Sequence, residues 1–355
     1  MPLLVLGAFA VGLVCGALWH RAWVFPFPRL HRWLHASPPG FLVQEADYYV
    51  ADEVAGHVHR PHAVRELEWP EHPAGRIRIA TNNLGFREDE DTLESKAGGT
   101  VRILVTGDSH VDGVVENSES FPNLLEALLS ATESGARHEV INGGVGVYGP
   151  RHYLGFLRKH LGLRPDVYIV VVYAGNDLVD ALSTAEREGR VRTPRRSRDY
   201  YAALEAGMAR DKGLVWQALN QAFLFHRYPP LVAQALEMAQ RPLLEIQRIC
   251  AREAIRFIVV LLPTRLDLRV TPDPYIASLM EEVFQMTWGL GAVNLDAGRQ
   301  LLRVLEDHGV ETLDVLPAFR RSAGKLFWSA DSHLGLEGHQ VLARAVFEYL
   351  AAERR

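Results

Sequence analysis

The sequence has few cysteines and no excess of basic residues. Its 355 residues include only Cys15 and Cys250. Cys15 lies in an apolar segment, so we expect no disulfide, and two thiols provide no cysteine-based zinc site. The formal net charge of −5 argues against a general nucleic-acid-binding protein, which needs a basic face for the phosphates. We therefore expect no nucleic-acid partner, and no cofactor is expected either.

Charged residues are also missing from Leu3 to Trp19, a segment long enough to cross a bilayer. No basic residue precedes it and no small-residue cleavage site follows it. The pattern therefore predicts an uncleaved anchor rather than a signal peptide. Its Gly12 and Gly16 form a small-xxx-small pattern that would let a partner helix approach. Arginines occur only on the C-terminal side of this segment, which by the positive-inside rule favours a cytoplasmic body.

The order of sequence patterns predicts four regions. Residues 1–19 form the transmembrane anchor, 20–40 a proline-containing juxtamembrane linker, 41–100 a β-rich arm, and 101–355 the main domain. A histidine cluster in the arm, His57, His59 and His62, suggests a metal site. No acidic or cysteine residue follows at the spacing of a further metal ligand, so we expect these histidines to bind no metal.

The main domain shows the alternation of strands and helices that is typical of an α/β fold with a mainly parallel sheet. Short apolar runs predict one strand from Val101 and four more over 139–142, 167–173, 256–262 and 311–315. Helical spacing of apolar residues predicts a helix over 120–129 and another over 335–352, and a further helix follows the glycine-rich turn and ends at about 160. Residues 180–235 interrupt this rhythm, which predicts an insertion over the sheet. Its arginine-rich stretch, 187–198, indicates either a solvated loop or a contact with an anionic polymer or lipid headgroup.

The predicted strand ends deliver polar groups suited to acyl transfer. Ser109 follows the first strand, Asn176 follows the third, and Asp331 and His333 lie near the C-terminus. A serine hydroxyl becomes a good nucleophile when a histidine takes its proton, and a carboxylate fixes the tautomer of that histidine. The alternative interpretation of Ser109 is that it caps the next helix, since serine is a favoured N-cap.

Three sequence blocks resemble those of the SGNH, or GDSL, hydrolase superfamily: Gly107-Asp108-Ser109, Gly175-Asn176-Asp177 and Asp331-Ser332-His333. The resemblance covers about residues 76–352. It implies a flavodoxin-like α/β/α sandwich in which Ser109 is the nucleophile, His333 the base and Asp331 its orienting partner. It also implies that the oxyanion is bound by the Asn176 side-chain amide and the Ser109 backbone N–H.

Two positions depart from the usual superfamily pattern. Many members place the acid three residues before the histidine, but Ala330 occupies that position here. The Asp-x-His spacing is similar to that of alginate-type O-acetyltransferases. In the glycine-rich turn after Asn142, the usual oxyanion glycine falls at Val147, and Gly146 is the alternative backbone donor.

Together these patterns predict a membrane-anchored serine esterase or O-acyltransferase that acts on acyl, chiefly acetyl, esters of a glycan. The resemblance favours an extracytoplasmic catalytic domain, against the arginine distribution. The alternative function is a catalytically weak scaffold module in a membrane polysaccharide assembly. The sequence leaves the oligomeric state open.

Overall fold

The structure is a computed structural model that describes residues 47–132, 137–269, 271 and 273–352. The chain divides into two units, Met1–Ala51 and Asp52–Arg355, and the α/β sheet belongs to the second. The predicted anchor and linker lie outside the described residues, so both stay predictions. Within the described ranges, no helix is both long and apolar enough to span a bilayer.

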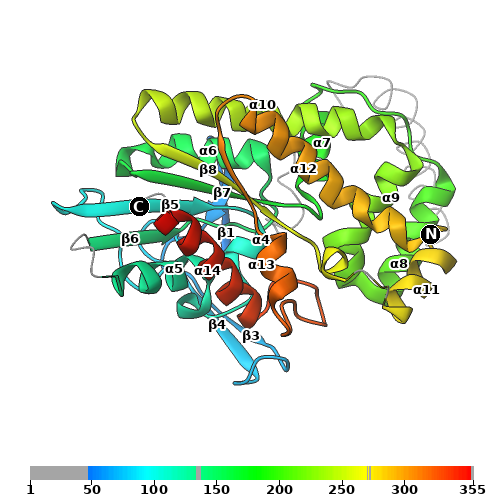
Figure 1. The fold of residues 1–355 in the computed structure, drawn as a ribbon, viewed down its shortest axis with the longest axis horizontal. Coiled ribbons are helices and arrows are strands. Elements are labelled where there is room, and N and C mark those ends of the chain that lie inside the picture. Colours follow the sequence, from blue (N-terminus) through cyan, green and yellow to red (C-terminus); the bar gives the residue numbers. More distant parts are fainter. Residues whose placement is uncertain (1–46, 133–136, 270, 272, 353–355) are drawn as a thin grey trace, which may run out of the picture. The chain divides into compact units, whose positions relative to one another are not determined.

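A five-stranded parallel sheet forms the centre of the second unit (Figure 1). Its strands are β5 (Thr100–Thr106), β6 (Arg137–Asn142), β7 (Val167–Tyr173), β8 (Arg256–Leu262) and β9 (Glu311–Asp314). They lie in the order β6-β5-β7-β8-β9, and every pair is parallel. Counted along the sheet's own strands this is 2-1-3-4-5, the flavodoxin order. The predicted parallel α/β sheet is therefore confirmed.

Helices cover both faces of the sheet (Figure 1). On one face lie α5 (Phe121–Ser130), α13 (Leu316–Arg321) and α14 (Leu336–Ala352), and on the other α6 (Pro150–His160), α7 (Asp177–Arg187), α10 (Pro230–Arg252) and α12 (Val293–Glu306). The core between the sheet and α5 and α14 is apolar and includes Ile103, Val105, Leu125 and Leu342. Because helices bury both faces of the sheet, almost every residue of its central strands is hydrophobic.

The strand and helix predictions in the main domain agree with the structure to within a few residues. The last strand ends one residue earlier than expected, because Val315 already precedes α13 in a helical conformation. Several helices of the described main domain were not predicted, among them α10, α11 (Pro274–Glu282), α12 and α13. The omission of α12 was avoidable, since Leu295, Leu302 and Leu305 are buried on one of its faces.

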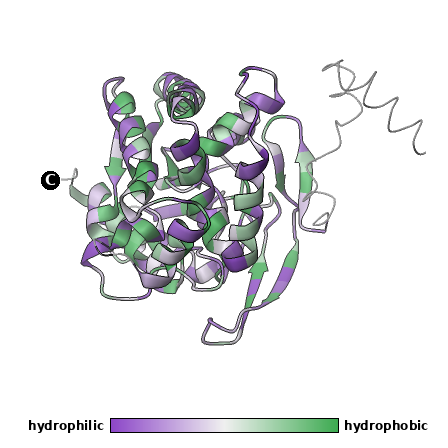
Figure 2. Ribbon diagram, turned by 90° about the vertical axis from the view of Figure 1, so that its right-hand side faces the viewer, coloured by the Kyte–Doolittle hydropathy of each residue, from purple (hydrophilic) through white to green (hydrophobic). Residues whose placement is uncertain are grey.

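The predicted β-rich region contains four short strands: β1 (Tyr49–Asp52), β2 (Gly56–His59), β3 (Val64–Glu68) and β4 (Arg76–Ala80). β3 and β4 pair in antiparallel fashion (Figure 2). Exposed and half-buried residues alternate along β3, and exposed arginines alternate with buried isoleucines along β4. This alternation leaves one face of the hairpin to pack and the other to solvent.

Most of the interval 180–235 is helical, but residues 188–197, which include most of the arginine-rich stretch, form neither helix nor strand. The interval contains the end of α7, then α8 (Arg198–Leu214), a π-helical turn (Val215–Leu219), α9 (Asn220–Arg227) and the start of α10. In the arginine-rich stretch, Arg196 forms an ion pair with Glu186 at 2.9 Å, while Arg195 and Arg198 are exposed. The stretch therefore fits the solvated alternative better, and an anionic partner stays a prediction.

Candidate active site

Ser109, His333 and Asp331 are joined by two hydrogen bonds. The Oγ of Ser109 lies 2.8 Å from Nε2 of His333, and Nδ1 of His333 lies 2.7 Å from a carboxylate oxygen of Asp331. The other carboxylate oxygen of Asp331 accepts the backbone N–H of His333 at 3.0 Å. Because the carboxylate can only accept, Nδ1 carries the proton and Nε2 is left to accept from the serine.

The turn after β5 presents Ser109 as the first residue of α4 (Ser109–Asp112). The N-cap of this helix is Asp108, whose side chain accepts the backbone N–H of His110 at 2.9 Å. The alternative interpretation, that Ser109 is the cap, is therefore wrong. The serine hydroxyl is left available for His333.

The loop that carries the acid and the base is held at both ends. The backbone N–H of Trp328 donates to the carbonyl of His333 at 2.8 Å. From the arm, the Glu71 carboxylate accepts the backbone N–H groups of Ser329 and Ala330 at 2.9 and 2.6 Å. No sequence pattern had indicated Glu71, because its partners are backbone groups more than 250 residues away.

The surroundings of His333 favour its charged form. Burial disfavours the imidazolium, but the hydrogen bond and charge of Asp331 outweigh burial and raise the pKa of His333 above 6.5. The more distant Asp108 and Asp112 act in the same direction. A histidine with this environment is suited to take a proton from serine and hold it as an ion pair with the neighbouring carboxylate.

The predicted oxyanion groups lie on loops next to Ser109. The side chain of Asn176 acts on the carboxyl group of Asp108, the residue before the serine, and opposes the rise of its pKa caused by burial. The glycine-rich turn is attached to the same loop, since the N–H of Val145 donates to the carbonyl of Gly107 at 3.2 Å. Whether Ser109, Asn176 and this turn bind an oxyanion stays a prediction.

Val147 has an unusual backbone conformation. Its φ is 65°, and the N–H of Tyr148 donates to the carbonyl of Val145 at 3.2 Å. Val147 thus occupies the third position of a turn where glycine is normally favoured. The residue is 52% exposed. The peptide bond between Gly146 and Val147 carries the carbonyl of Gly146 and the N–H of Val147. That carbonyl accepts from His57 Nε2 at 2.8 Å.

The histidine cluster of the arm is not assembled as a metal site. His57 is bonded to the Gly146 carbonyl, whereas His59 Nε2 lies 3.3 Å from the Asp112 carboxylate. Across the described ranges, no group of three or more histidine, cysteine, aspartate or glutamate side chains is arranged to hold a metal ion.

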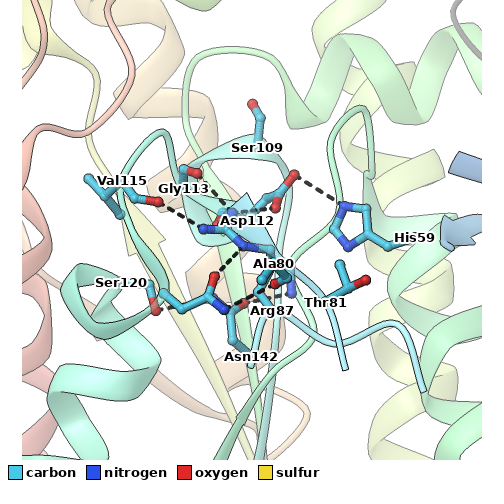
Figure 3. A network of polar contacts seen from close by, with 12 residues as sticks. His59, Ala80, Thr81, Arg87, Ser109, Asp112, Gly113, Val115, Ser120 and Asn142 are labelled. Atoms are coloured by element: carbon cyan, nitrogen blue, oxygen red, sulfur yellow. Dashed lines mark hydrogen bonds and ion pairs between the residues drawn. The ribbon is translucent and has the colours of Figure 1, made fainter. Parts of the chain in front are cut away.

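A buried arginine, also missed from the sequence, supports the helix that begins at Ser109 (Figure 3). Arg87 is fully buried and donates to the Asp112 side chain at 2.8 Å and to the carbonyls of Gly113 and Val115 at 2.9 and 2.8 Å. A single arginine in a charged segment gives no signal that it will be buried.

Gln217 is the remaining residue that sequence reasoning missed. Its side-chain nitrogen lies 3.1 Å from Nε2 of His333, the atom that also contacts Ser109. Gln217 lies in the π-helical turn of the insertion and is buried. The sequence offers no motif for it, although π-helical turns are frequent at functional sites.

A cavity of about 330 Å³ lies beside the loop of the acid and the base. Its lining includes Arg265, Arg269, Trp288 and Ser329. Arg265 donates to the hydroxyl of Ser332 at 3.3 Å, which connects the cavity wall to the residue between Asp331 and His333.

No protein-family model matches the sequence, and the comparison with curated proteins gives no match. Solved structures do resemble the chain. An α/β hydrolase from the metagenome of Lake Arreo, Spain, is 18% identical, and the match covers 72% of this chain and 97% of that one, with a TM-score of 0.43. An acetylxylan esterase from Geobacillus stearothermophilus is 14% identical over 72% and 95% of the two chains, with a TM-score of 0.42.

A lipolytic protein of the G-D-S-L family from Desulfitobacterium hafniense is also similar, with 14% identity over 70% of this chain and 98% of that one and a TM-score of 0.41. The solved structures that resemble the chain thus include hydrolases, esterases and a member of the family that the sequence blocks resemble. Since each of these TM-scores is below 0.5, the functional argument depends on the geometry of the site.

Proposed function

We propose that the protein is a serine esterase of the SGNH/GDSL type that removes an acetyl group from a glycan through an acyl-enzyme. The observation that carries this proposal is the 2.8 Å contact between Ser109 Oγ and His333 Nε2, with Asp331 on the opposite ring nitrogen. Each group has the partner that its role requires: the hydroxyl faces a base, and the base faces a carboxylate.

The proposed reaction has two halves. Ser109 Oγ attacks the ester carbonyl carbon while its proton moves to His333 Nε2. The tetrahedral intermediate then expels the sugar alcohol, which takes that proton from His333. In the second half, water attacks the acetyl-serine, His333 again accepts and returns a proton, and acetate leaves. Backbone N–H groups of Ser109 and of Gly146 or Val147, with the Asn176 amide, are the proposed donors to the oxyanion.

The cavity next to the loop of Asp331 and His333, which no residue of the triad lines, favours a substrate larger than a simple ester. Trp288 provides an aromatic surface for the apolar face of a sugar ring, and Arg265 and Arg269 provide hydrogen-bond donors for its oxygens. A sugar hydroxyl that entered this site in place of water would resolve the acyl-enzyme as a transferase. We also propose that Leu3–Trp19 anchors the protein in a membrane with the catalytic domain on the extracytoplasmic side, on the sequence argument alone.

Hydrolysis of p-nitrophenyl acetate tests the proposal. We expect activity in the wild-type protein and loss to near background in Ser109→Ala and His333→Ala, with thermal unfolding close to that of wild type. A Ser109→Ala variant with wild-type activity would rule out the assigned nucleophile.

A fluorophosphonate label separates the esterase from the scaffold alternative. The label reacts with a serine only when a base activates it, so we expect modification of Ser109 in the wild type and none in His333→Ala. A folded wild-type protein that resists the label would favour the scaffold.

A further inference from the structure

Gln217 is brought to the triad by the insertion, not by the sheet. Two packing contacts fix the position of its π-helical turn. A Cβ added at Gly213 would lie 2.5 Å from the Cα of Asp331, and one added at Gly175 would collide with the backbone oxygen of Gln217. The insertion therefore approaches both the acid and the loop of Asn176 as closely as glycine allows.

The donors and acceptors around Gln217 determine which end of its side-chain amide faces His333. The backbone N–H of Leu334 donates to Nδ1 of His110 at 3.3 Å, so this nitrogen is the acceptor. Burial holds the pKa of His110 well below 6.5, so the ring is neutral and its proton is on Nε2. That N–H donates to the side-chain oxygen of Gln217 at 3.1 Å. The amide nitrogen of Gln217 must then face His333, and it donates to Nε2.

We propose that Gln217 is a positioning residue: its amide, oriented by His110, holds the neutral ring of His333 in place for Ser109. This inference rests on the proposed function of the triad. The lone pair of Nε2 receives two donors, Ser109 Oγ at 2.8 Å and the Gln217 amide at 3.1 Å. When Nε2 takes the serine proton it becomes a donor, and the bond from Gln217 is lost. Gln217 therefore stabilises the neutral base and opposes its protonation.

Other titratable groups also face His333, and they set the background against which Gln217 acts. Asp331, Asp108 and Asp112 favour the imidazolium through their charge. His110 and His339 are buried with lowered pKa values, so both are neutral near pH 7. A substitution of Gln217 by a neutral residue changes none of these five side chains, although it removes the acceptor of the His110 Nε2–H. The charges around His333 therefore stay the same, and a shift in its titration reports on the lost amide contact.

Gln217→Met tests the inference, because methionine is similar in shape but cannot donate. We expect the acidic limb of the kcat/KM profile for p-nitrophenyl acetate to move to higher pH by a few tenths to about one unit, the size of one hydrogen bond. Gln217→Glu should move the limb further in the same direction, because its negative charge stabilises the imidazolium.

The matched control is Gln221→Met, one turn along the chain. Gln221 is also buried, but it bonds to the Val179 N–H, the Ala174 carbonyl and the Asn294 side chain and not to the triad. We expect the acidic limb of the kcat/KM profile of Gln221→Met to stay at the wild-type pH even if this variant is less stable. If the acidic limb lies at the same pH in the wild type and in Gln217→Met, the inference is overturned and Gln217 is a packing residue.

Nuclear magnetic resonance of the full chain in detergent micelles tests the same bond without catalysis. We expect the side-chain NH₂ signals of Gln217 to shift with pH at the titration midpoint of His333, and to lose that dependence in His333→Ala. Signals that ignore this titration would overturn the inference. Since the measurement needs no turnover, it gives an answer even if the wild-type protein shows no esterase activity and the proposed function fails.

Discussion

Arg87 binds the far end of the four-residue helix that begins at Ser109. Its guanidinium donates to the Asp112 carboxylate at 2.8 Å and to the Asp112 carbonyl at 2.5 Å. The side chain of Arg87 is fully buried, and that of Asp112 nearly so. Burial alone would raise the pKa of Asp112, but His59 and Arg87 outweigh it and lower this pKa to about 2. The Asp112 carboxylate and the Arg87 guanidinium are thus both ionised at neutral pH.

Asp112→Ala should destabilise the protein by about 3–5 kcal/mol, because it leaves the Arg87 charge buried without its carboxylate. The free energy of unfolding from urea titration checks this value. As a control, Glu237→Ala removes one partner of the exposed pair Glu237–Arg241 and should cost less than about 1 kcal/mol. Equal losses in the two variants would show that the Arg87 network contributes no more than a surface ion pair.

Asp331→Asn should lower the pH at which activity appears. In the wild type the Asp331 carboxylate raises the pKa of His333 above 6.5, so the active neutral base is lost as pH falls through that raised value. The amide of asparagine removes this charge, so the acidic limb of kcat/KM should move to lower pH. The maximal rate should fall as well, by up to about 10⁴-fold if tautomer control dominates, since Nδ1 loses its acceptor.

A full profile of kcat/KM between pH 4 and 9 measures both effects. We expect the loss at the optimum to be smaller than that of His333→Ala. A limb that stays in place, or moves to higher pH, would contradict the assignment of Asp331 as the partner of His333.

The sequence was informative wherever the contributing residues obey a local rule. The strand runs predicted the parallel sheet, and the ends of parallel strands meet at one edge. Ser109 and Asn176 could therefore be predicted as neighbours. The Asp331–His333 pair lies in a loop beyond α13 and was identified through its resemblance to a superfamily block. The cap of α4 was ambiguous from sequence, since Asp108 and Ser109 are both good N-cap residues and only the backbone geometry decides between them.

The residues that escaped prediction act across long separations in the chain. Gln217 and His333 are 116 residues apart, and Arg87 and Asp112 belong to a charged loop and a short helix. Their roles depend on burial and on the direction of a side chain, and neither property has a sequence period. Val147 was found through a departure from a family pattern, which identified the position but not its backbone conformation.

Val147→Gly should raise the free energy of unfolding. The left-handed conformation of Val147, with φ 65°, costs a residue with a Cβ about 1–2 kcal/mol. Glycine adopts this conformation without strain, but it makes the unfolded chain more flexible, which lowers the free energy of unfolding by roughly 0.5–1 kcal/mol. The net gain should be about 0.5–1 kcal/mol, measured by urea titration. Val145→Gly is the control and should destabilise, because Val145 is buried and makes no left-handed turn.

The acyl preference of Val147→Gly decides whether the turn lies at the acyl pocket. If the N–H of Val147 faces the oxyanion, its side chain narrows the pocket and favours acetyl esters. Removing it should then shift the ratio of kcat/KM for acetyl over butyryl esters by about ten- to a hundred-fold toward butyryl, since a methylene in an apolar pocket is worth about 1–3 kcal/mol.

If Gly146 supplies the donor instead, the ratio should stay unchanged. The left-handed backbone means that Val147→Gly should gain stability under either arrangement, so stability does not distinguish them. Only the chain-length ratio does. An unchanged ratio in a stabilised, active variant would show that the side chain of Val147, a residue that is already 52% exposed, points to solvent and not into the acyl pocket.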